Sequence, residues 1–586
     1  MGMRTLDMFL RKSVPNGFFE INIEEEIRKY YDNATKPNPP APIIVIDLMV
    51  MGHAICQADY NGQICGGRLK VAYMLLDQLF TKLRECGAVL EFFCDGPVQV
   101  NKYGKWCERQ NRSYRGMLDF YDEVDYGCTT AELIETEIVL IVHGGYPLKQ
   151  LAQKHGRLTT SFGIECVQES AAYATDNKAL AILSNDTDYL IYAGTWHLWS
   201  SMNINFDTLT TLEYNRQGLM DTLDLSYSQM PLFALLSGDN VLDFEMLQKF
   251  YDKLGNPSNR FHDLAEFVRQ HPEDLQRSKQ LRLLLRGIVG RAAVNSDLVK
   301  RFQQGLNFYD TNFHPPNLNP NGDHVLDVLL KQNSTFLYAV WVGKPKELAT
   351  TFVDLQPHHF GIYYPRMIIS IMSRQAGIIL YHRQKRRIDS DFTRFNLLTK
   401  LSHNADHSLQ QHRVEFPEHI EPPSLVDLLS TDPEKRAQLQ EIKLQLFCWI
   451  ASDTLNHRLL KPIPEELRIM VVTLYCLMEN RLLKLFEADH LLQIAYDVTY
   501  ETYDHTKINL PRTFHSRGYR VAFLFISVFN VFMEAYKDLG LASETLNEYP
   551  PFDGMLFHNH YENWSVQKQN LNQIREWRIY DRLVPH

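Results

Sequence analysis

The sequence lacks the cysteine patterns that mark a disulfide framework or a zinc site. Its nine cysteines are scattered over 586 residues, none of them forms a CxxC pair, and their number is odd. Small secreted domains and zinc ribbons both need closely placed cysteines, so these two classes of protein are excluded. We therefore expect reduced cysteines in an intracellular protein.

Excess positive charge and long apolar runs are also scarce. The net charge is −10, so any binding of nucleic acid must come from a local basic patch. The opening segment, MGMRTLDMFLRKS, has no apolar core of the kind that a signal peptide needs. The most apolar window, residues 521–533, is too short to span a bilayer and contains Ser527 and Asn530. We expect a buried helix there and no contact with a membrane.

Short apolar runs are present in the first half of the chain. Strands are predicted at 43–47 (IIVID), 88–95 (AVLEFFCD), 163–168 (GIECVQ) and 180–186 (LAILSND), and helical spacing of apolar residues follows or precedes them, as at 67–86. Alternating strands and helices predict an α/β fold with a mostly parallel sheet and helices on both faces.

The second half shows a different pattern. Beyond about residue 320 every clear apolar periodicity is helical, so an all-helical region is predicted. A chain of 586 residues is too long for one core. We predict an α/β domain over 1–310 and a helical C-terminal domain over 311–586, the latter able to contact protein partners.

Aspartates stand where the predicted strands end. Asp47 and Asp95 close two strands, Asp186 and Asp188 follow a third, and Asp239 follows an apolar helix. The carboxyl ends of parallel strands meet at one edge of a sheet, where burying several acids is costly unless a cation compensates. Mg²⁺ and Mn²⁺ prefer oxygen ligands, and an extended Asp-x-Asp step points both side chains to one side. Two such ions would activate a water that attacks a phosphodiester.

The NDTD segment at 185–188 has other interpretations. An EF-hand loop is excluded because Leu190 and Ile191 stand where an oxygen ligand and a glycine are needed. A metal-dependent nucleotide-sugar transferase also uses Asp-x-Asp, but it leaves the other aspartates without a role. Ordinary capping aspartates remain the alternative, most of all for Asp239.

A basic segment lies at 101–115, NKYGKWCERQNRSYR, with five cations and one acid. Lys102, Lys105 or Trp106, and Arg109 recur at helical spacing, so cations and an aromatic ring share one face, which suits a nucleic-acid strand. A solvated basic helix face is the alternative. The candidate nucleic-acid-binding residues are Lys105, Trp106, Arg112 and Arg115.

In these residues the chain resembles the XPG/flap-endonuclease-like (PIN-like) nuclease superfamily and, within it, the Asteroid family. The segments that carry the resemblance occur in order: MGMRTLDMFLRK, VID, CDG, LSNDTDYLIY and PLFALLSGDN. The resemblance implies a metal-dependent nuclease fold with an arch-like insertion at 101–160, and Lys102 and Arg109 as catalytic cations that grip the scissile phosphate. The metal ligands that it implies are Asp47, Asp95, Glu169, Asp186, Asp188 and Asp239.

The chain departs from the nuclease pattern in two places. The family carries a pair of acids after the strand that precedes LSND; here only Glu169 fits, and Glu165 falls inside the strand predicted at 163–168. Flap endonucleases follow their last aspartate with a glycine-rich hairpin that holds duplex DNA, and GDNVLDFEMLQKFYDKLG has no such glycines.

The function expected from these observations is a structure-specific, Mg²⁺-dependent DNA endonuclease that prefers single-stranded or overhang DNA. Its place would be DNA repair in the nucleus, in preference to the cytoplasm, with RNA as an alternative substrate. The competing hypothesis is a degenerate nuclease fold that serves as an RNA-binding or protein-interaction scaffold, as in the related constitutive coactivators of PPAR-gamma.

Overall fold

The computed structural model describes most of the chain: residues 6–35, 38–136, 145–238, 244–254, 259–271, 278–312, 315–385, 393–543, 546 and 549–566. It divides into two compact units that do not follow the chain in simple order. The first unit takes in residues 1–54, 76–96 and 152–316, and the second takes in 55–75, 97–151 and 317–586. The domain bounds predicted from the sequence, at 310 and 311, remain a prediction.

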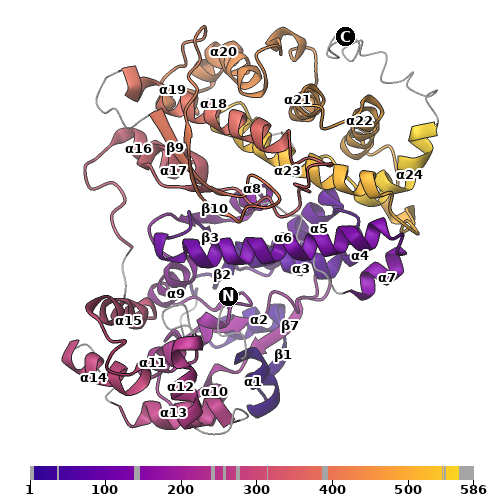
Figure 1. The fold of residues 1–586 in the computed structure, drawn as a ribbon. Helices are drawn as coiled ribbons and strands as arrows, with labels where there is room; N and C mark the ends of the chain where they lie inside the picture. The colour runs from indigo at the N-terminus through magenta and orange to yellow at the C-terminus, as the bar shows by residue number, and fades with distance from the viewer. Residues whose placement is uncertain are drawn as a thin grey trace. The chain divides into compact units, whose positions relative to one another are not determined.

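A seven-stranded sheet forms the centre of the first unit (Figure 1). Its strand order is β1-β7-β6-β5-β2-β3-β4, and the five strands from β6 to β4 run parallel, whereas β7 is antiparallel to both of its neighbours, β6 and β1. The bounds are β1 (Phe18–Asn22), β2 (Ile43–Asp47), β3 (Val89–Asp95), β4 (Arg157–Ser161), β5 (Ala181–Leu183), β6 (His197–Trp199) and β7 (Thr210–Tyr214). The mostly parallel sheet that the sequence predicted is confirmed.

Helices cover both faces of this sheet. Neighbouring residues of β3 point to opposite faces, as in any strand. The ring of Phe92 packs against Phe80 of α5 (Leu69–Glu85), with ring centroids 4.9 Å apart. The ring of Phe93 packs against Tyr173 of α9 (Cys166–Asp176) at 5.3 Å. The α/β class with helices on both faces is therefore confirmed.

One strand lies elsewhere than predicted. The segment GIECVQ at 163–168 was expected to be a strand, but β4 is Arg157–Ser161 and α9 begins at Cys166. The prediction was wrong because β4 is an edge strand, paired only with β3, and its sequence RLTTS is polar. Its two threonines favour the strand through β-branching and not through an apolar run.

A group of helices completes the first unit. Helices α11 to α15 follow the sheet in the chain and pack side by side, so their apolar faces form one core, whereas α1 and α2 precede β2. The bounds are α1 (Leu6–Ser13), α2 (Ile23–Asp32), α10 (Arg216–Leu223), α11 (Met230–Leu236), α12 (Phe244–Leu254), α13 (Arg260–Arg269), α14 (Ser278–Val289) and α15 (Ser296–Phe308).

The second unit is mainly helical, as expected, with one correction. A small sheet of β8 (Lys346–Glu347), β9 (Arg394–Thr399) and β10 (Ser408–Arg413) lies in the region predicted to be all-helical. The helices are α4 (Tyr60–Ile64), α6 (Tyr103–Asp125), α7 (Thr130–Glu135), α16 (His324–Lys331), α17 (Thr335–Val342), α18 (Tyr364–Lys385), α19 (Leu425–Leu428), α20 (Pro433–Ala451), α21 (Glu465–Glu479), α22 (Leu485–Tyr500), α23 (Ser516–Asp538) and α24 (Gly554–Val566). Helices α3 (Met51–Ala58) and α8 (Gly145–His155) each contain a boundary between the units.

Helix α23 contains the most apolar window of the sequence. With 23 residues it is long enough to cross a membrane, but 78% of its apolar window is buried inside the protein. Arg520 in this helix is buried and binds Asp354 through its guanidinium. Burial of this kind is what a core helix needs, so the predicted buried helix is confirmed.

Candidate functional site

The strand ends bring three of the predicted carboxylates to one edge of the sheet. Asp47 is the last residue of β2, Asp95 is the last residue of β3, and Asp186 follows β5 by three positions. Strands β5, β2 and β3 are parallel neighbours, so their carboxyl ends lie together. The sequence predicted this shared edge, because the carboxyl ends of parallel strands meet at one edge of a sheet.

Asp47 is the most perturbed of these acids. It is only 5% exposed, and the pKa of its carboxyl is raised from the ordinary 3.8 to about 7, with burial as the largest cause. The negative charges of Asp95 and Asp186 are the next causes of this rise, which means that both lie near Asp47. The hydroxyl of Ser184 donates a hydrogen bond of 3.0 Å to Oδ2 and acts in the opposite direction.

Asp186 and Asp188 do not form the extended Asp-x-Asp step that we expected. Asp186 caps the 3₁₀-helix η3 (Thr187–Leu190), and its Oδ1 accepts a hydrogen bond of 3.0 Å from the backbone N–H of Asp188. Asp188 lies inside that turn, buried, and its Oδ1 accepts a hydrogen bond of 3.4 Å from the hydroxyl of Tyr309. The prediction was wrong because an aspartate at this position caps a turn more readily than it continues a strand.

Glu169 lies in the first turn of α9. Burial raises the pKa of its carboxyl, while a hydrogen bond from Ser161 and the charge of Arg157 lower it. Glu165 was placed inside a strand by the sequence, but it is the N-cap residue of α9. Two acids therefore flank the start of this helix, one before it and one in its first turn.

Cys166 is a member of the cluster that the sequence reasoning missed. Its thiol is fully buried, and burial raises the thiol pKa well above the usual value, with the charges of Asp47 and Asp95 adding to that effect. It follows that a neutral thiol lies close to both carboxyls. No feature of the sequence distinguishes this cysteine from the eight others.

The basic segment lies in the second unit, on η2 (Val100–Lys102) and α6. Lys102, Lys105 and Arg109 are half-buried, whereas Arg112 and Arg115 are exposed. Trp106 does not share an open face with them: it is 9% exposed, and its ring packs edge-on against His407 with centroids 5.7 Å apart. The expectation that Trp106 offers a stacking surface is corrected, because the helix turns this ring into the core.

A metal centre was the main expectation for this edge of the sheet, and it stays a prediction. In the part of the chain that the structure describes, no three or more His, Cys, Asp or Glu side chains come together as a group that could hold a metal ion. Asp188 is held by Tyr309, and a thiol, which is a poor ligand for Mg²⁺, lies beside Asp47. Asp239 lies outside the described residues.

One protein-family model matches a part of the chain. A family model described as the FAM120A-like domain matches residues 223–312, which span α11 to α15 of the first unit. This is a small part of the chain, so the match describes these helices and not the whole protein.

Curated relatives match a longer stretch. The constitutive coactivator of peroxisome proliferator-activated receptor gamma from Bos taurus is 28% identical over 255 residues, which is 43% of this chain and 35% of that protein. The human constitutive coactivator of PPAR-gamma-like protein 1 is 20% identical over 347 residues, which is 54% of this chain and 30% of that protein. The chain thus spans about a third of the length of the relatives that it matches. Because these relatives carry coactivator names, the resemblance to the Asteroid family stays a prediction.

Among solved structures, this chain is similar to human GEN1 in complex with Holliday junction DNA. The identity is 13%, the TM-score is 0.32, and the match covers 76% of this chain and 99% of that one. It is also similar to the catalytic core of Rad2 in complex with DNA substrate, with 15% identity, a TM-score of 0.30, and coverage of 57% and 93%. Scores this low add no argument about the activity of this chain.

Proposed function

We propose that this chain is an adaptor, in which a nuclease-like α/β unit and a mainly helical unit bind a protein partner without hydrolysing nucleic acid. The strand-end cluster carries this proposal. Asp47 lies near Asp95, Asp186 and the thiol of Cys166, and within the described residues no metal-ligating group forms. Protonation can reduce the repulsion between these acids in place of a cation. The pKa of the Asp47 carboxyl is about 7, so this group takes up a proton near neutral pH.

The names of the sequence relatives support the same function. They describe coactivation of a receptor, which is a different kind of activity from phosphodiester hydrolysis. We extend this kind of role to the present chain, with a nuclear location and a protein partner. The matched helices at 223–312 belong to the part that we expect to take part in binding.

A second candidate function is hydrolysis of single-stranded or overhang DNA with Mg²⁺ or Mn²⁺. One observation favours it: Asp47, Asp95 and Asp186 lie close enough for two of the charges to raise the pKa of the third carboxyl. In this reading Lys102 and Arg109 grip a phosphate. The remaining predicted participants are Lys105, Arg112, Arg115, Glu169, Asp188 and Asp239.

A cleavage assay separates the two functions. One labelled sequence is incubated with the full chain and Mg²⁺ or Mn²⁺ as a single strand, a 3′ overhang, a 5′ flap and a blunt duplex. The adaptor predicts no cleavage above that of the Asp186→Asn variant on any substrate. The nuclease predicts cutting of the single strand and overhang, and a loss of about a thousandfold or more in rate in Asp186→Asn.

The matched control is Asp176→Asn, which changes an exposed aspartate at the end of α9. It should behave as the wild type in every lane. Cleavage by the wild type and by Asp176→Asn, lost in Asp186→Asn at unchanged thermal stability, would overturn the adaptor function in favour of the nuclease.

A further inference from the structure

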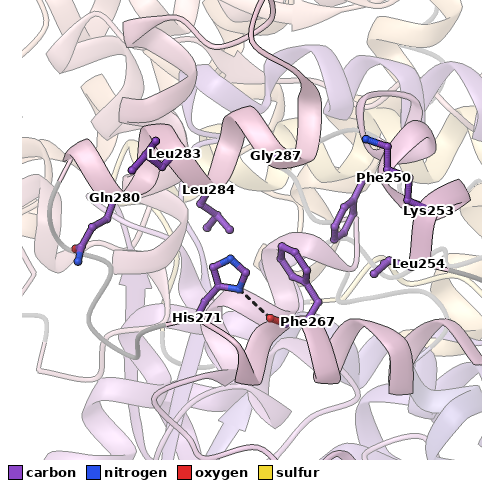
Figure 2. Close-up of a pocket in the computed structure, with 9 residues that line it drawn as sticks. All are labelled: Phe250, Lys253, Leu254, Phe267, His271, Gln280, Leu283, Leu284 and Gly287. Atoms are coloured by element: carbon purple, nitrogen blue, oxygen red, sulfur yellow. Dashed lines mark hydrogen bonds between the residues drawn. The ribbon is translucent and has the colours of Figure 1, made fainter.

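Three helices of the first unit, α12, α13 and α14, line an open groove with a volume of about 510 Å³ (Figure 2). It lies within the segment matched by the FAM120A-like domain and contains none of the strand-end carboxylates. Figure 2 shows side chains from all three helices around the same space, with Phe267 on α13 and His271, two residues after the end of that helix, facing Leu284 on α14.

The floor of the groove is apolar. The rings of Phe250 on α12 and Phe267 on α13 meet edge to face, with centroids 4.9 Å apart. Leu283 on α14 lines the groove and is 59% exposed, so it presents apolar surface on the groove wall. Gly287 lies one turn further along α14, and a Cβ atom built on it meets no atom of the described residues within 4 Å. An apolar side chain from outside would find both contact surface and room here.

Two hydrogen-bond acceptors line the same groove. The side-chain Oε1 of Gln280 is buried and has no hydrogen-bond partner among the residues that the structure describes. His271 donates from Nδ1 to the backbone carbonyl of Phe267 at 2.8 Å, so in the neutral ring Nε2 is an acceptor. Acceptors at the edge of an apolar groove suit N–H donors, such as those that the first turn of a bound helix leaves without a partner.

Among the described residues the charges around the groove are mostly positive, although the acids Asp252 and Glu266 adjoin the lining residues Lys253 and Phe267. Lys253 is the charged residue among those that line it, and the lining contains no carboxylate. Helix α14, SKQLRLLLRGIV, adds Lys279, Arg282 and Arg286 and has no acidic residue. Asp252, beside Lys253, accepts a hydrogen bond of 2.8 Å from the side-chain amide of Gln248. A partner that enters this groove therefore meets a net positive rim.

We propose that the groove binds an acidic amphipathic peptide segment of a partner protein. Apolar side chains spaced one helical turn apart enter between α12, α13 and α14, and carboxylates of the peptide face Lys253 and the cations of α14. This inference rests on the adaptor function and gives it a binding site. The peptide assay does not use the carboxylates and the cleavage assay does not use the groove, so failure of one is distinguishable from failure of the other.

The probe is a fluorescein-labelled helical peptide of about 14 residues, rich in Asp and Glu, with Phe and Leu four positions apart. Two matched peptides replace either the acids by Lys or the two apolar residues by Ala. Fluorescence polarisation with the full chain should show binding of the acidic amphipathic peptide, and at least about tenfold weaker binding of each matched peptide. Equal binding of the Lys peptide, or no binding of the acidic one, would overturn the proposal.

Gly287→Leu tests the location, because the new side chain occupies the groove without displacing a neighbour. It should reduce peptide affinity about tenfold or more while the melting temperature is maintained. The control is Gly116→Leu in α6, a second helical glycine whose Cβ would meet nothing within 4 Å. It should bind the peptide as the wild type does. Full binding by a folded Gly287→Leu protein would show that the peptide binds elsewhere.

Charge is tested by Lys253→Glu against Lys249→Glu, two changes of equal charge on α12. Lys249 is exposed and does not line the groove. Lys253→Glu should weaken binding and reduce its dependence on salt, and Lys249→Glu should do so much less. If the groove instead binds a second copy of the chain, size-exclusion chromatography with light scattering will show a dimer that Gly287→Leu dissociates, and the peptide proposal is then wrong.

Discussion

Two buried carboxyls, Asp354 in the second unit and Asp47 in the first, have opposite electrostatic surroundings. Asp354 is 0% exposed and accepts a hydrogen bond of 2.7 Å from Nε of Arg520. Arg520 also donates two hydrogen bonds of 2.8 Å to the carboxylate of Asp125, in the fork geometry that suits a guanidinium. Asp47 is also buried, but the charges that act on it, those of Asp95 and Asp186, are negative like its own.

This difference separates a structural acid from a candidate functional one. A buried ion pair with saturated hydrogen bonds neutralises its own charge and holds two segments of chain together. A buried acid among acids keeps its repulsion, so the fold loses stability by retaining it. Stability alone therefore explains Asp354 and does not explain Asp47.

The largest effect is expected when the ion pair is broken. Arg520→Met leaves Asp354 buried without its cation, which should lower the free energy of unfolding by about 3 to 5 kcal/mol. Urea denaturation at pH 7 measures this change. The control is Arg28→Ala, which removes an exposed pair with Glu24 one helical turn away and should cost about 0.5 kcal/mol or less. Equal costs for the two variants would remove the distinction between structural and surface pairs in this protein.

Asp47→Asn should have the opposite effect and raise the free energy of unfolding. The pKa of Asp47 is raised from 3.8 to about 7 in the folded protein, so the folded state binds its proton more tightly than the unfolded chain between these values. The carboxyl therefore costs stability fully above pH 7 and costs nothing below about pH 4. Asp47→Asn should stabilise the protein by about 2 to 4 kcal/mol at pH 8 and have little effect at pH 4.

The measurement is the difference in unfolding free energy between wild type and Asp47→Asn across this pH range, in chelator, so that other titrating groups cancel. Asp176→Asn, an exposed change of the same kind, should show no such slope. A wild type that is more stable than Asp47→Asn at pH 8 in chelator would mean that the folded protein stabilises the carboxylate of Asp47, contrary to a raised pKa.

The sequence predicts those structural features whose signal lies in neighbouring residues. The strands at 43–47 and 88–95 were predictable because buried parallel strands are continuous apolar runs, and the aspartates that end them follow directly. The mainly helical second unit was predictable from periodicity. The turn at 187–190 was not, because the same residues also suit an extended step.

Contacts distant in sequence were beyond prediction. Arg520 and Asp354 are 166 positions apart, and nothing in either local sequence marks the pair. The thiol of Cys166 reaches the carboxylates only because α9 begins at that residue, which the polar edge strand β4 concealed. Trp106 appeared to belong with the cations of its helix, and its burial depends on the segment that contains His407.

Ser184→Ala sharpens the comparison from within the cluster. The hydroxyl of this buried serine donates to Oδ2 of Asp47 at 3.0 Å and accepts from the backbone N–H of Asp186 at 3.1 Å. Its loss should raise the pKa of Asp47 further and cost about 1 to 2 kcal/mol of stability at pH 8, and less at pH 5, where the carboxyl is protonated. Ser170→Ala removes a buried serine that binds the backbone carbonyl of Cys166; its cost should be the same at both pH values.

Asp186→Asn should have the smallest effect on stability and a clear effect on a pKa. The charge of Asp186 is one cause of the raised pKa of Asp47, after burial and the charge of Asp95. Removing that charge should lower the pKa of Asp47, while an asparagine oxygen can still accept from the N–H of Asp188 and keep the cap of η3. The repulsion falls only in part and the cap is kept, so the free energy of unfolding at pH 7 should change by about 1 kcal/mol or less.

Carbon-13 NMR of the Asp47 carboxyl follows its titration in wild type, Asp186→Asn and the Asp176→Asn control. A pKa for Asp47 that is the same in all three proteins would mean that burial alone perturbs it. The acids at this edge of the sheet would then be independent, and the contrast with Asp354 would be one of solvation and not of charge.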